Sequence, residues 1–421
     1  MTASEQLAQF AAGSKALPKL CREYKKESAT VHLKELVGGA LSFYAAAAVA
    51  KTGGVHIFVA EDRDAAAYLL NDFYNLLDEK QVYFFPSSYK RSVAYGAEDA
   101  QGVVQRTAAM NAVRGFTKGY LVVCTYPEAL AERVVDAATL QRDTIAVKLG
   151  DKISIAVLED ALADANFTRV DFVYEPGQYS VRGGIVDVFS YSESKPYRID
   201  FFGDEVDSIR RFNISSQLSA DKLDRVEIVP NLNAGEAPRV SFVQFAGSGA
   251  TCWFYDADYV LRRVNDLRRK VLADMEEPGR IDGLLTSRNV LLRDMAGNSV
   301  VALRDNLPER PATAAVVFDT APQPKFNKNF EMLADDMIRN SLRGYATYIL
   351  SENKVQVERL ENIFHQIGRG QAAVRSLSVT LHEGFVDNDL KLCLYTDHQI
   401  FDRYQRYRIN GEIRRDEQMT V

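Results

Sequence analysis

The feature that most constrains the fold is residues 174–212, where apolar and polar side chains alternate in three runs. Gly-rich or Ser/Pro-rich segments separate the runs. Alternation with a period of two places successive side chains on opposite faces of a strand. The stretch therefore predicts a small antiparallel sheet with one buried face.

The run at residues 197–202 assigns a different chemistry to each face. One face is an ordinary apolar core face, made of Tyr197, Ile199 and Phe201. The other carries a cation, an anion and a ring: Arg198, Asp200 and Phe202. Arg and aromatic residues are enriched at the centres of protein interfaces. A slip of one residue in register would turn this second face inward.

A simpler alternative remains open for that second face. Arg198 and Asp200 would form an exposed ion pair worth under about 1 kcal/mol, with Gly203–Asp204 as a plain turn. The preceding run ends with Arg182, followed by Gly183 and Gly184. Adjacent glycines within a strand indicate a bulge or a close backbone approach.

The residues VRGG, PYRIDFFGDE and DSIR occur in this stretch in that order. Together they resemble domain 2 of the excision-repair protein UvrB and of bacterial transcription-repair coupling factors. The resemblance implies a docking surface for UvrA, with contacts from Arg182, Arg198, Asp200 and Phe202. Ser180 departs from UvrB, where another Arg stands, so we expect one ionic contact to be lost there.

Length and composition are those of a folded protein with several domains. The chain has 421 residues, of which 47% are hydrophobic and 26% charged, and this length predicts about two to four domains. The net charge of −6 gives no overall basic footprint for nucleic acid. We expect a monomeric cytoplasmic protein, because the N-terminus lacks a signal-peptide pattern and the longest apolar run is too short for a bilayer.

The cysteines and histidines predict neither a metal site nor a catalytic centre. Cys21, Cys124, Cys252 and Cys393 are far apart, without a CxxC pair or a His at ligand spacing. The last three lie in apolar strand-like runs and are expected to be buried, reduced thiols.

Residues 28–143 alternate helical and strand patterns, which predicts a mainly parallel, doubly wound sheet. Ligands of such sheets bind at the carboxyl ends of the strands. The place to look is residues 37–42, where Gly38 and Gly39 precede an Ala-rich helix.

This glycine loop lacks the residues of a working P-loop. GxxxxGK[ST] needs the Lys for the β- and γ-phosphates and the hydroxyl for Mg²⁺, but the next Lys here is Lys51. The acidic pair expected after the strand at residues 120–125 is missing as well. We therefore expect a helicase-like fold that binds no cofactor. The resemblance implies the same degeneracy, which separates coupling factors from UvrB.

A second difference from UvrB concerns residues 84–105. UvrB has a long Tyr-rich hairpin there that inserts at DNA lesions, whereas this segment is short. The segment has Tyr89 and Tyr95 with Lys90 and Arg91. A modest nucleic-acid contact through Tyr89–Arg91 is one alternative. A solvated loop is the other.

These observations predict an α/β protein with four segments. Residues 1–143 and 229–320 would form a degenerate helicase-like, P-loop-type domain, into which an antiparallel UvrA-binding domain (144–228) is inserted. A small α/β domain (321–421) would follow, with residues 321–328 as the linker. The pair Asp397–His398 would cap a helix. The basic residues 403–415 would lead toward further domains of a longer protein.

The function implied by the resemblance is docking rather than catalysis. The chain would be an N-terminal fragment of a coupling factor that recruits UvrA to stalled RNA polymerase. Contacts to the polymerase and to DNA, and the ATP-dependent translocase, would lie in regions beyond this chain. The alternative is a UvrB-type, damage-binding helicase subunit, which requires the missing Lys and acidic residues. An unrelated hydrolase has no nucleophile–base pattern to support it.

Overall fold

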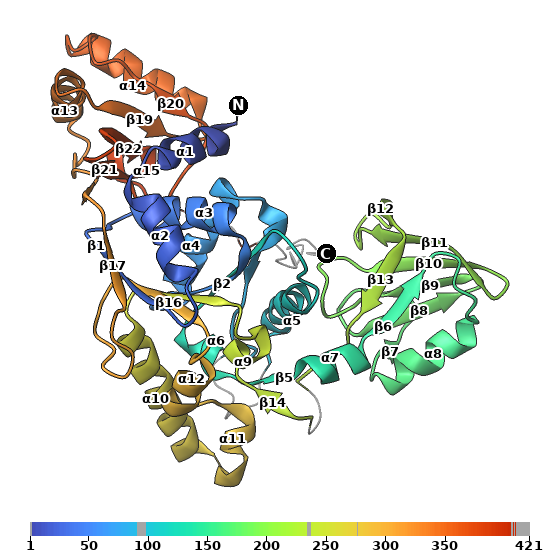
Figure 1. The fold of residues 1–421 in the computed structure, drawn as a ribbon. Helices are drawn as coiled ribbons and strands as arrows, with labels where there is room; N and C mark the ends of the chain where they lie inside the picture. The colour runs from blue at the N-terminus through green and yellow to red at the C-terminus, as the bar shows by residue number, and fades with distance from the viewer. Residues whose placement is uncertain are drawn as a thin grey trace.

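The computed structural model describes residues 2–405, apart from 91–97, 234–236 and 276, together with 407 and 409. These residues form three larger sheets and two short strand pairs. Figure 1 shows a central parallel sheet, a lobe built on an antiparallel sheet, and a mixed sheet on the other side of the centre.

The central sheet has seven strands in the described residues, and every neighbouring pair is parallel. Their spatial order is β17 (Ala314–Val317), β1 (Thr30–Lys34), β16 (Ser299–Ala302), β15 (Thr251–Phe254), β2 (Gly54–Val59), β4 (Tyr120–Thr125) and β3 (Val82–Phe84). Strands covered on both faces form continuous apolar runs, as in YLVVCT of β4. The predicted parallel α/β class is confirmed.

Helices lie on both sides of this sheet, with α3 and α4 above it and α10 and α12 below it in Figure 1. Asp62 and Asp256 cap α4 and α10 by accepting hydrogen bonds from the backbone N–H groups of Ala65 and Tyr259. The α-helices of this part are α1 (Ala3–Ala12), α2 (Ala16–Tyr24), α3 (Ala40–Thr52), α4 (Arg63–Leu76), α5 (Ala100–Arg114), α6 (Pro127–Ala131), α7 (Ala137–Asp143), α9 (Phe242–Ala246), α10 (Ala257–Asp274), α11 (Ile281–Leu284) and α12 (Arg288–Asp294). Two 3₁₀ turns, η1 (Glu79–Gln81) and η3 (Pro278–Arg280), and the strand pair β5 (Val134–Val135) and β14 (Arg239–Val240) complete it.

The antiparallel sheet forms a lobe that stands apart from the parallel sheet (Figure 1). Its described strands, in spatial order, are β12 (Ser219–Leu223), β11 (Glu205–Phe212), β10 (Tyr197–Phe202), β9 (Ile185–Val188), β8 (Gln178–Arg182) and β7 (Thr168–Arg169), with only β7–β8 parallel. One face packs on α8 (Ile155–Asp164) through Leu158 and Leu162. The pair β6 (Ile145–Lys148) and β13 (Arg225–Ile228) leads into and out of the lobe.

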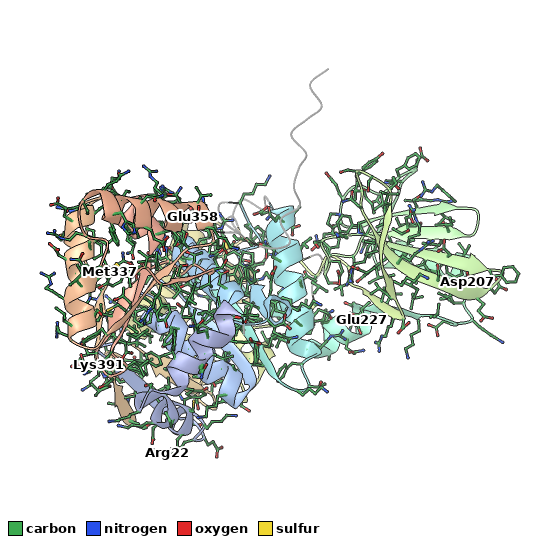
Figure 2. The ribbon with its side chains drawn as sticks, turned by 90° about the horizontal axis from the view of Figure 1, so that it is seen from above. Arg22, Asp207, Glu227, Met337, Glu358 and Lys391 are labelled. Carbon is green, nitrogen blue, oxygen red and sulfur yellow. The ribbon has the colours of Figure 1, made fainter. Side chains whose placement is uncertain are left out.

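Figure 2 shows the same lobe from above, with Asp207 toward its far end and Glu227 where it meets the rest of the molecule. At that junction Arg114 of α5 pairs with Glu227 of β13 at 2.5 Å between nitrogen and oxygen. The pair therefore links the lobe to a helix of the central domain.

The adjacent glycines form a turn, so the predicted bulge is wrong. Arg182 faces Ile185 across the hairpin, which leaves Gly183–Gly184 as a two-residue turn between β8 and β9. Gly183 has a φ of +60°, which favours glycine. The register of the β10–β11 pair shifts instead at Asp200/Phe201, where Asp207 of β11 is the extra residue of a bulge. The close approach is present, since a Cβ on Gly184 would lie 3.0 Å from the Phe201 carbonyl oxygen.

The mixed sheet and its helices form the last unit. Its described strands, in spatial order, are β18 (Thr320–Pro322), β21 (Phe385–Asp387), β22 (Leu392–Thr396), β19 (Ala346–Leu350) and β20 (Ser376–Leu377). Its helices are α13 (Phe330–Leu342), α14 (Lys354–Gln366) and α15 (Asp397–Ile400). The unit packs on the central domain, where Phe385 contacts Phe43 of α3 with ring centroids 5.3 Å apart.

The prediction of a linker at residues 321–328 is wrong, because residues 321–322 belong to strand β18 and the residues after them pack into the same unit. Pro322 ends the edge strand β18, a position where a missing N–H is tolerated. Gln323 is buried and accepts a hydrogen bond from the N–H of Thr396 at 2.7 Å. Phe326 is buried in the core of this unit.

The capping role predicted for Asp397–His398 is also wrong. Thr396 is the N-cap residue of α15, and its side chain makes no capping bond. Asp397 instead accepts a hydrogen bond from the Ser351 hydroxyl at 2.6 Å, and His398 bonds the His382 carbonyl oxygen at 2.8 Å. Both side chains therefore join α15 to neighbouring segments of the same unit.

Candidate docking surface and nucleotide loop

The two faces of β10 differ as the alternation predicts. Tyr197 and Ile199 are buried against the core of the lobe. Arg198 and Asp200 are half-buried on the opposite face, and Phe202 is 84% exposed beside the turn that ends the strand. The predicted register is therefore confirmed. Phe202 therefore presents an apolar ring to solvent at the end of a strand whose outer face carries charged side chains.

The ion pairs on this outer face join different strands. Arg198 donates from Nε and Nη2 to the two carboxylate oxygens of Asp187 on β9, at 2.7 and 2.8 Å. Asp200 instead pairs with Arg210 of β11. The alternative of an Arg198–Asp200 pair is thus wrong. The reason is register, since Arg198 directly faces Asp187 across the ladder, whereas Asp200 lies two positions along its own strand.

Arg182 joins the same network from β8. Its Nη2 pairs with Asp187, and its guanidinium carbon lies 4.9 Å from the centre of the Phe172 ring. Ser180, the position that departs from UvrB, is buried and donates its hydroxyl to the Asp171 carbonyl at 2.9 Å. It therefore holds the 170–177 loop on the sheet and offers nothing to a partner.

The structure thus brings Arg182 and Arg198 together through a residue that the sequence interpretation did not single out. Asp187 is 2% exposed, although it lies on the outer face of the sheet. The signal was visible in IVDVF, where one carboxylate interrupts an apolar strand. A buried charge needs a partner, so that interruption could have predicted a facing arginine.

The second candidate site is the glycine loop between β1 and α3. Gly38 has a φ of +57°, and Gly39 is the N-cap residue of α3. A Cβ on Gly39 would lie 2.1 Å from the Glu383 carbonyl oxygen. Backbone of the last unit therefore packs directly on the loop, with a carbonyl dipole where a P-loop would hold phosphate.

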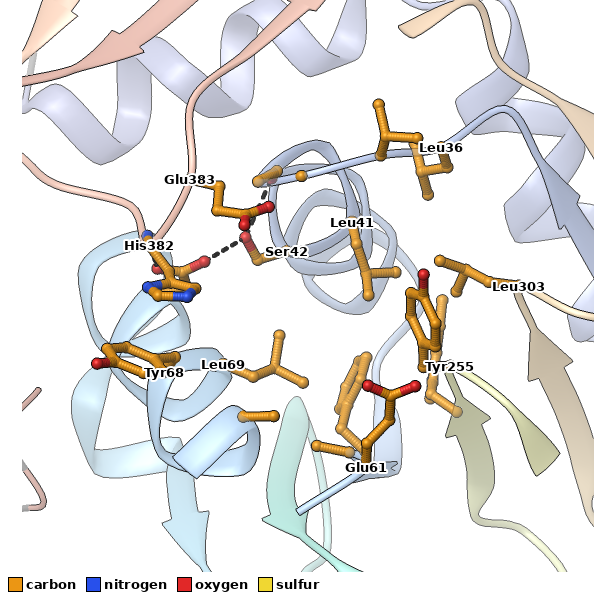
Figure 3. Close-up of a pocket in the computed structure, with 18 of the residues that line it drawn as sticks. Leu36, Leu41, Ser42, Glu61, Tyr68, Leu69, Tyr255, Leu303, His382 and Glu383 are labelled. Atoms are coloured by element: carbon orange, nitrogen blue, oxygen red, sulfur yellow. Dashed lines mark hydrogen bonds between the residues drawn. The ribbon is translucent and has the colours of Figure 1, made fainter. Parts of the chain in front are cut away.

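A cavity of about 380 Å³ lies beside this loop, at the carboxyl ends of β1, β2 and β15. Figure 3 shows Glu61, Tyr68, Tyr255 and His382 around it, with the Ser42 hydroxyl bonded toward the neighbouring helix. Among the described residues that line it, three are carboxylic acids (Glu61, Asp72 and Glu383) and none is Lys or Arg. These acidic side chains would not compensate the negative charge of a bound triphosphate.

Asp72 fixes the geometry of this second site. One carboxylate oxygen accepts from the Ser42 hydroxyl at 2.7 Å, and the other accepts from the His382 backbone N–H at 2.7 Å. Burial raises the pKa of Asp72 to about 7, and the two donated hydrogen bonds oppose this rise. The Ser42 hydroxyl, in the first turn of the helix after the glycine loop, is therefore already engaged.

The region compared with the UvrB hairpin is only partly described. Tyr89 forms an antiparallel bridge with Glu98 and is half-buried. Arg91 and Tyr95 lie outside the described residues. The nucleic-acid contact suggested for Tyr89–Arg91 stays a prediction.

Cysteines and possible metal ligands were also compared with the predictions, within the described part of the chain. All four cysteines are unpaired and buried, as predicted for Cys124, Cys252 and Cys393. The described residues contain no group of three or more His, Cys, Asp or Glu side chains arranged to hold a metal ion. None of their helices is long and apolar enough to cross a bilayer.

Comparison with known proteins finds relatives both of the lobe and of a longer part of the chain. A family model described as the UvrB interaction domain matches residues 145–233, which include the whole antiparallel sheet. Transcription-repair-coupling factors of Bacillus subtilis and Escherichia coli are each 27% identical over 199 residues, or 47% of this chain. The chain resembles the N-terminal region of transcription-repair coupling factors.

The transcription-repair-coupling factor of Haemophilus influenzae is 35% identical over 101 residues, or 24% of this chain. The matched stretches cover 17% of the Bacillus and Escherichia proteins and 9% of the Haemophilus protein. The resemblance predicted from VRGG and PYRIDFFGDE is confirmed.

Proposed function

We propose that this chain is a non-catalytic docking module that recruits UvrA in transcription-coupled nucleotide excision repair. The observation that carries the proposal is the outer face of the antiparallel sheet. There Phe202 is 84% exposed at the end of a strand whose preceding residues hold an ordered arginine network. Arg and aromatic side chains provide much of the binding energy of protein interfaces.

The contact residues of this proposal are Arg182, Arg198, Asp200 and Phe202. Arg198 and Asp200 already have partners within the sheet. Arg182 and Phe202 are more available, since 37% of the Arg182 side chain is exposed. We therefore assign the largest direct contribution to Phe202 and Arg182.

The central domain contributes a scaffold rather than an ATPase in this proposal. The carbonyl oxygen over Gly39 and the acidic lining of the adjacent cavity both oppose phosphate binding. Binding of RNA polymerase, DNA translocation and ATP hydrolysis are proposed for regions of the whole protein beyond this chain. We also propose that the chain acts as a monomer in the cytoplasm.

The decisive experiment is a calorimetric titration of the chain with UvrA. Phe202→Ala should weaken binding by about 2 kcal/mol, or roughly 30-fold, because a central aromatic contact is lost. The folded state should be unaffected, since the ring makes little contact within the chain. Leu342→Ala is a matched control, because Leu342 is 85% exposed on α13 of the mixed-sheet unit.

Three outcomes are informative. Binding that Phe202→Ala weakens and Leu342→Ala leaves unchanged supports the proposed surface. Equal binding by all three proteins moves the contact elsewhere on the chain. Absence of binding by the unmodified chain contradicts the docking function itself.

A further inference from the structure

One buried carboxylate organises the charged part of the docking face. Asp187 accepts two hydrogen bonds from Arg198 and a third from Arg182. These residues come from three neighbouring strands, β8, β9 and β10. Asp187 therefore couples the positions of two arginines that lie far apart in the sequence.

Aromatic rings support the two guanidinium groups. The guanidinium carbon of Arg182 lies 4.9 Å from the Phe172 ring centre, and that of Arg198 lies 4.3 Å from the Phe212 ring centre. A guanidinium over a ring gains cation–π attraction. Each arginine is thus held by the shared carboxylate and by its own ring, which leaves it little freedom to reorient.

The two arginines differ in side-chain exposure and in the hydrogen bonds that they make. The Arg198 side chain is only 14% exposed, and Nη2 also donates to the Gln217 side chain at 3.2 Å. The Arg182 side chain is 37% exposed, and only its Nη2 donates a hydrogen bond within the described residues. Nη2 donates one of its two N–H groups to Asp187, so one edge of the guanidinium, formed by Nη2 with either Nε or Nη1, keeps two N–H groups for an approaching acceptor.

From this geometry we propose that Asp187 is a positioning residue for docking, and that the group received by Arg182 is a carboxylate of UvrA. The inference rests on the proposed function and adds the chemistry of the partner group. A guanidinium fork matches a carboxylate with two parallel hydrogen bonds. Orienting the fork in advance reduces the side-chain entropy lost on binding. Asp187 contributes through Arg182 and Arg198, without itself contacting UvrA.

The test measures UvrA affinity for the whole chain carrying Arg182→Lys, Asp187→Asn, Arg182→Ala, or Asp187→Asn with Arg182→Ala. Arg182→Lys keeps the charge but loses the fork, and should weaken binding about tenfold. Asp187→Asn should weaken it at least about as much. Asp160→Asn is the control, because Asp160 is exposed on α8, which covers the opposite face of the sheet.

The double variant separates positioning from general weakening of the fold. If Asp187 acts by orienting Arg182, Asp187→Asn should cost much less affinity in the Arg182→Ala background than in the unmodified chain. A purely structural role would give the same loss in both backgrounds. Salt should also weaken binding of the unmodified chain more than binding of Arg182→Ala, because a charge pair is screened.

The outcomes distinguish this inference from the proposed function. Absence of binding by the unmodified chain contradicts the proposed function. Binding by the unmodified chain with equal affinity for Arg182→Lys overturns the inference alone. That comparison decides the case even if Asp187→Asn does not fold, because Arg182→Lys leaves Asp187 paired with Arg198. Additive losses in the double variant overturn the positioning role.

Discussion

Asp187 and Asp72 are both buried aspartates, yet their surroundings have opposite consequences. Asp187 is paired with two arginines and lies on the outer face of the antiparallel sheet. Asp72 receives a hydroxyl and a backbone N–H, and burial raises its pKa to about 7. The first site presents oriented cations to solvent. At the second, the Ser42 hydroxyl and the backbone of the loop at His382 hold the carboxylate beside the glycine loop.

The difference shows how one residue type supports docking in one region and packing in another. The two arginines offset the cost of burying the Asp187 carboxylate. The hydroxyl and the N–H group that donate to Asp72 carry no charge and offset that cost less. Changes at the two aspartates should therefore have different sizes and different pH dependence.

The largest expected effect is on the stability of the lobe. Asp187→Asn removes one charge from a buried network and should lower the free energy of opening of the antiparallel sheet by about 3–5 kcal/mol. Hydrogen exchange of the β9 and β10 amides measures this quantity. Asp72→Asn should leave those amides unchanged. Equal protection of the sheet in both variants would contradict the importance assigned to the Asp187 network.

The next effect concerns the glycine loop. Gly39→Ala places a Cβ 2.1 Å from the Glu383 carbonyl oxygen and should destabilise the packing of the last unit on α3 by about 1–3 kcal/mol. The φ of Gly39 is −64°, so the effect is steric. Urea denaturation measures it. Gly249→Ala is the control, because nothing lies within 4 Å of its Cβ position; equal stability of both variants would contradict the close contact.

A pH-dependent effect should follow from Asp72. Its pKa of about 7 in the folded protein exceeds the value of about 3.9 expected in the unfolded chain. Between about pH 4 and pH 7 the folded state therefore binds more protons. The free energy of unfolding should then fall as pH rises, by up to about 1.4 kcal/mol per pH unit.

Asp72→Asn should remove this contribution, which denaturant titrations at several pH values would detect. Asp160→Asn, at an exposed position, should retain it. An unchanged pH slope in Asp72→Asn would assign the dependence to other groups.

The smallest expected effect is that of nucleotide. MgATP at millimolar concentration should leave the melting temperature of the chain unchanged, because a ligand stabilises a protein only when it binds the folded state. The carboxylates around the cavity and the carbonyl over Gly39 oppose such binding. A saturable increase in melting temperature would contradict the degenerate-loop interpretation and favour the UvrB-type alternative.

Local patterns of apolar and polar residues predicted much of the architecture. Alternation in residues 197–202 placed Tyr197 inward and Phe202 outward, and the continuous apolar run at β4 marked a strand buried on both faces. Some elements were not predicted: α1, α2 and β1, before the Ala-rich helix, and α8 and α12, farther along the chain. The boundaries at residues 143, 228 and 320 stay predictions.

The sequence by itself determined the parallel α/β class, the antiparallel sheet, the missing P-loop lysine and the outward direction of Arg198 and Phe202. These follow from periodicity and residue type, which act over a few neighbouring positions. The tertiary structure alone decided that Asp187, rather than Asp200, holds the arginines, and that Glu383 covers Gly39. Such contacts depend on strand register and on packing between residues distant in the chain. The carboxylate in IVDVF signals that a buried charge needs a partner, but it does not say which residue that partner is.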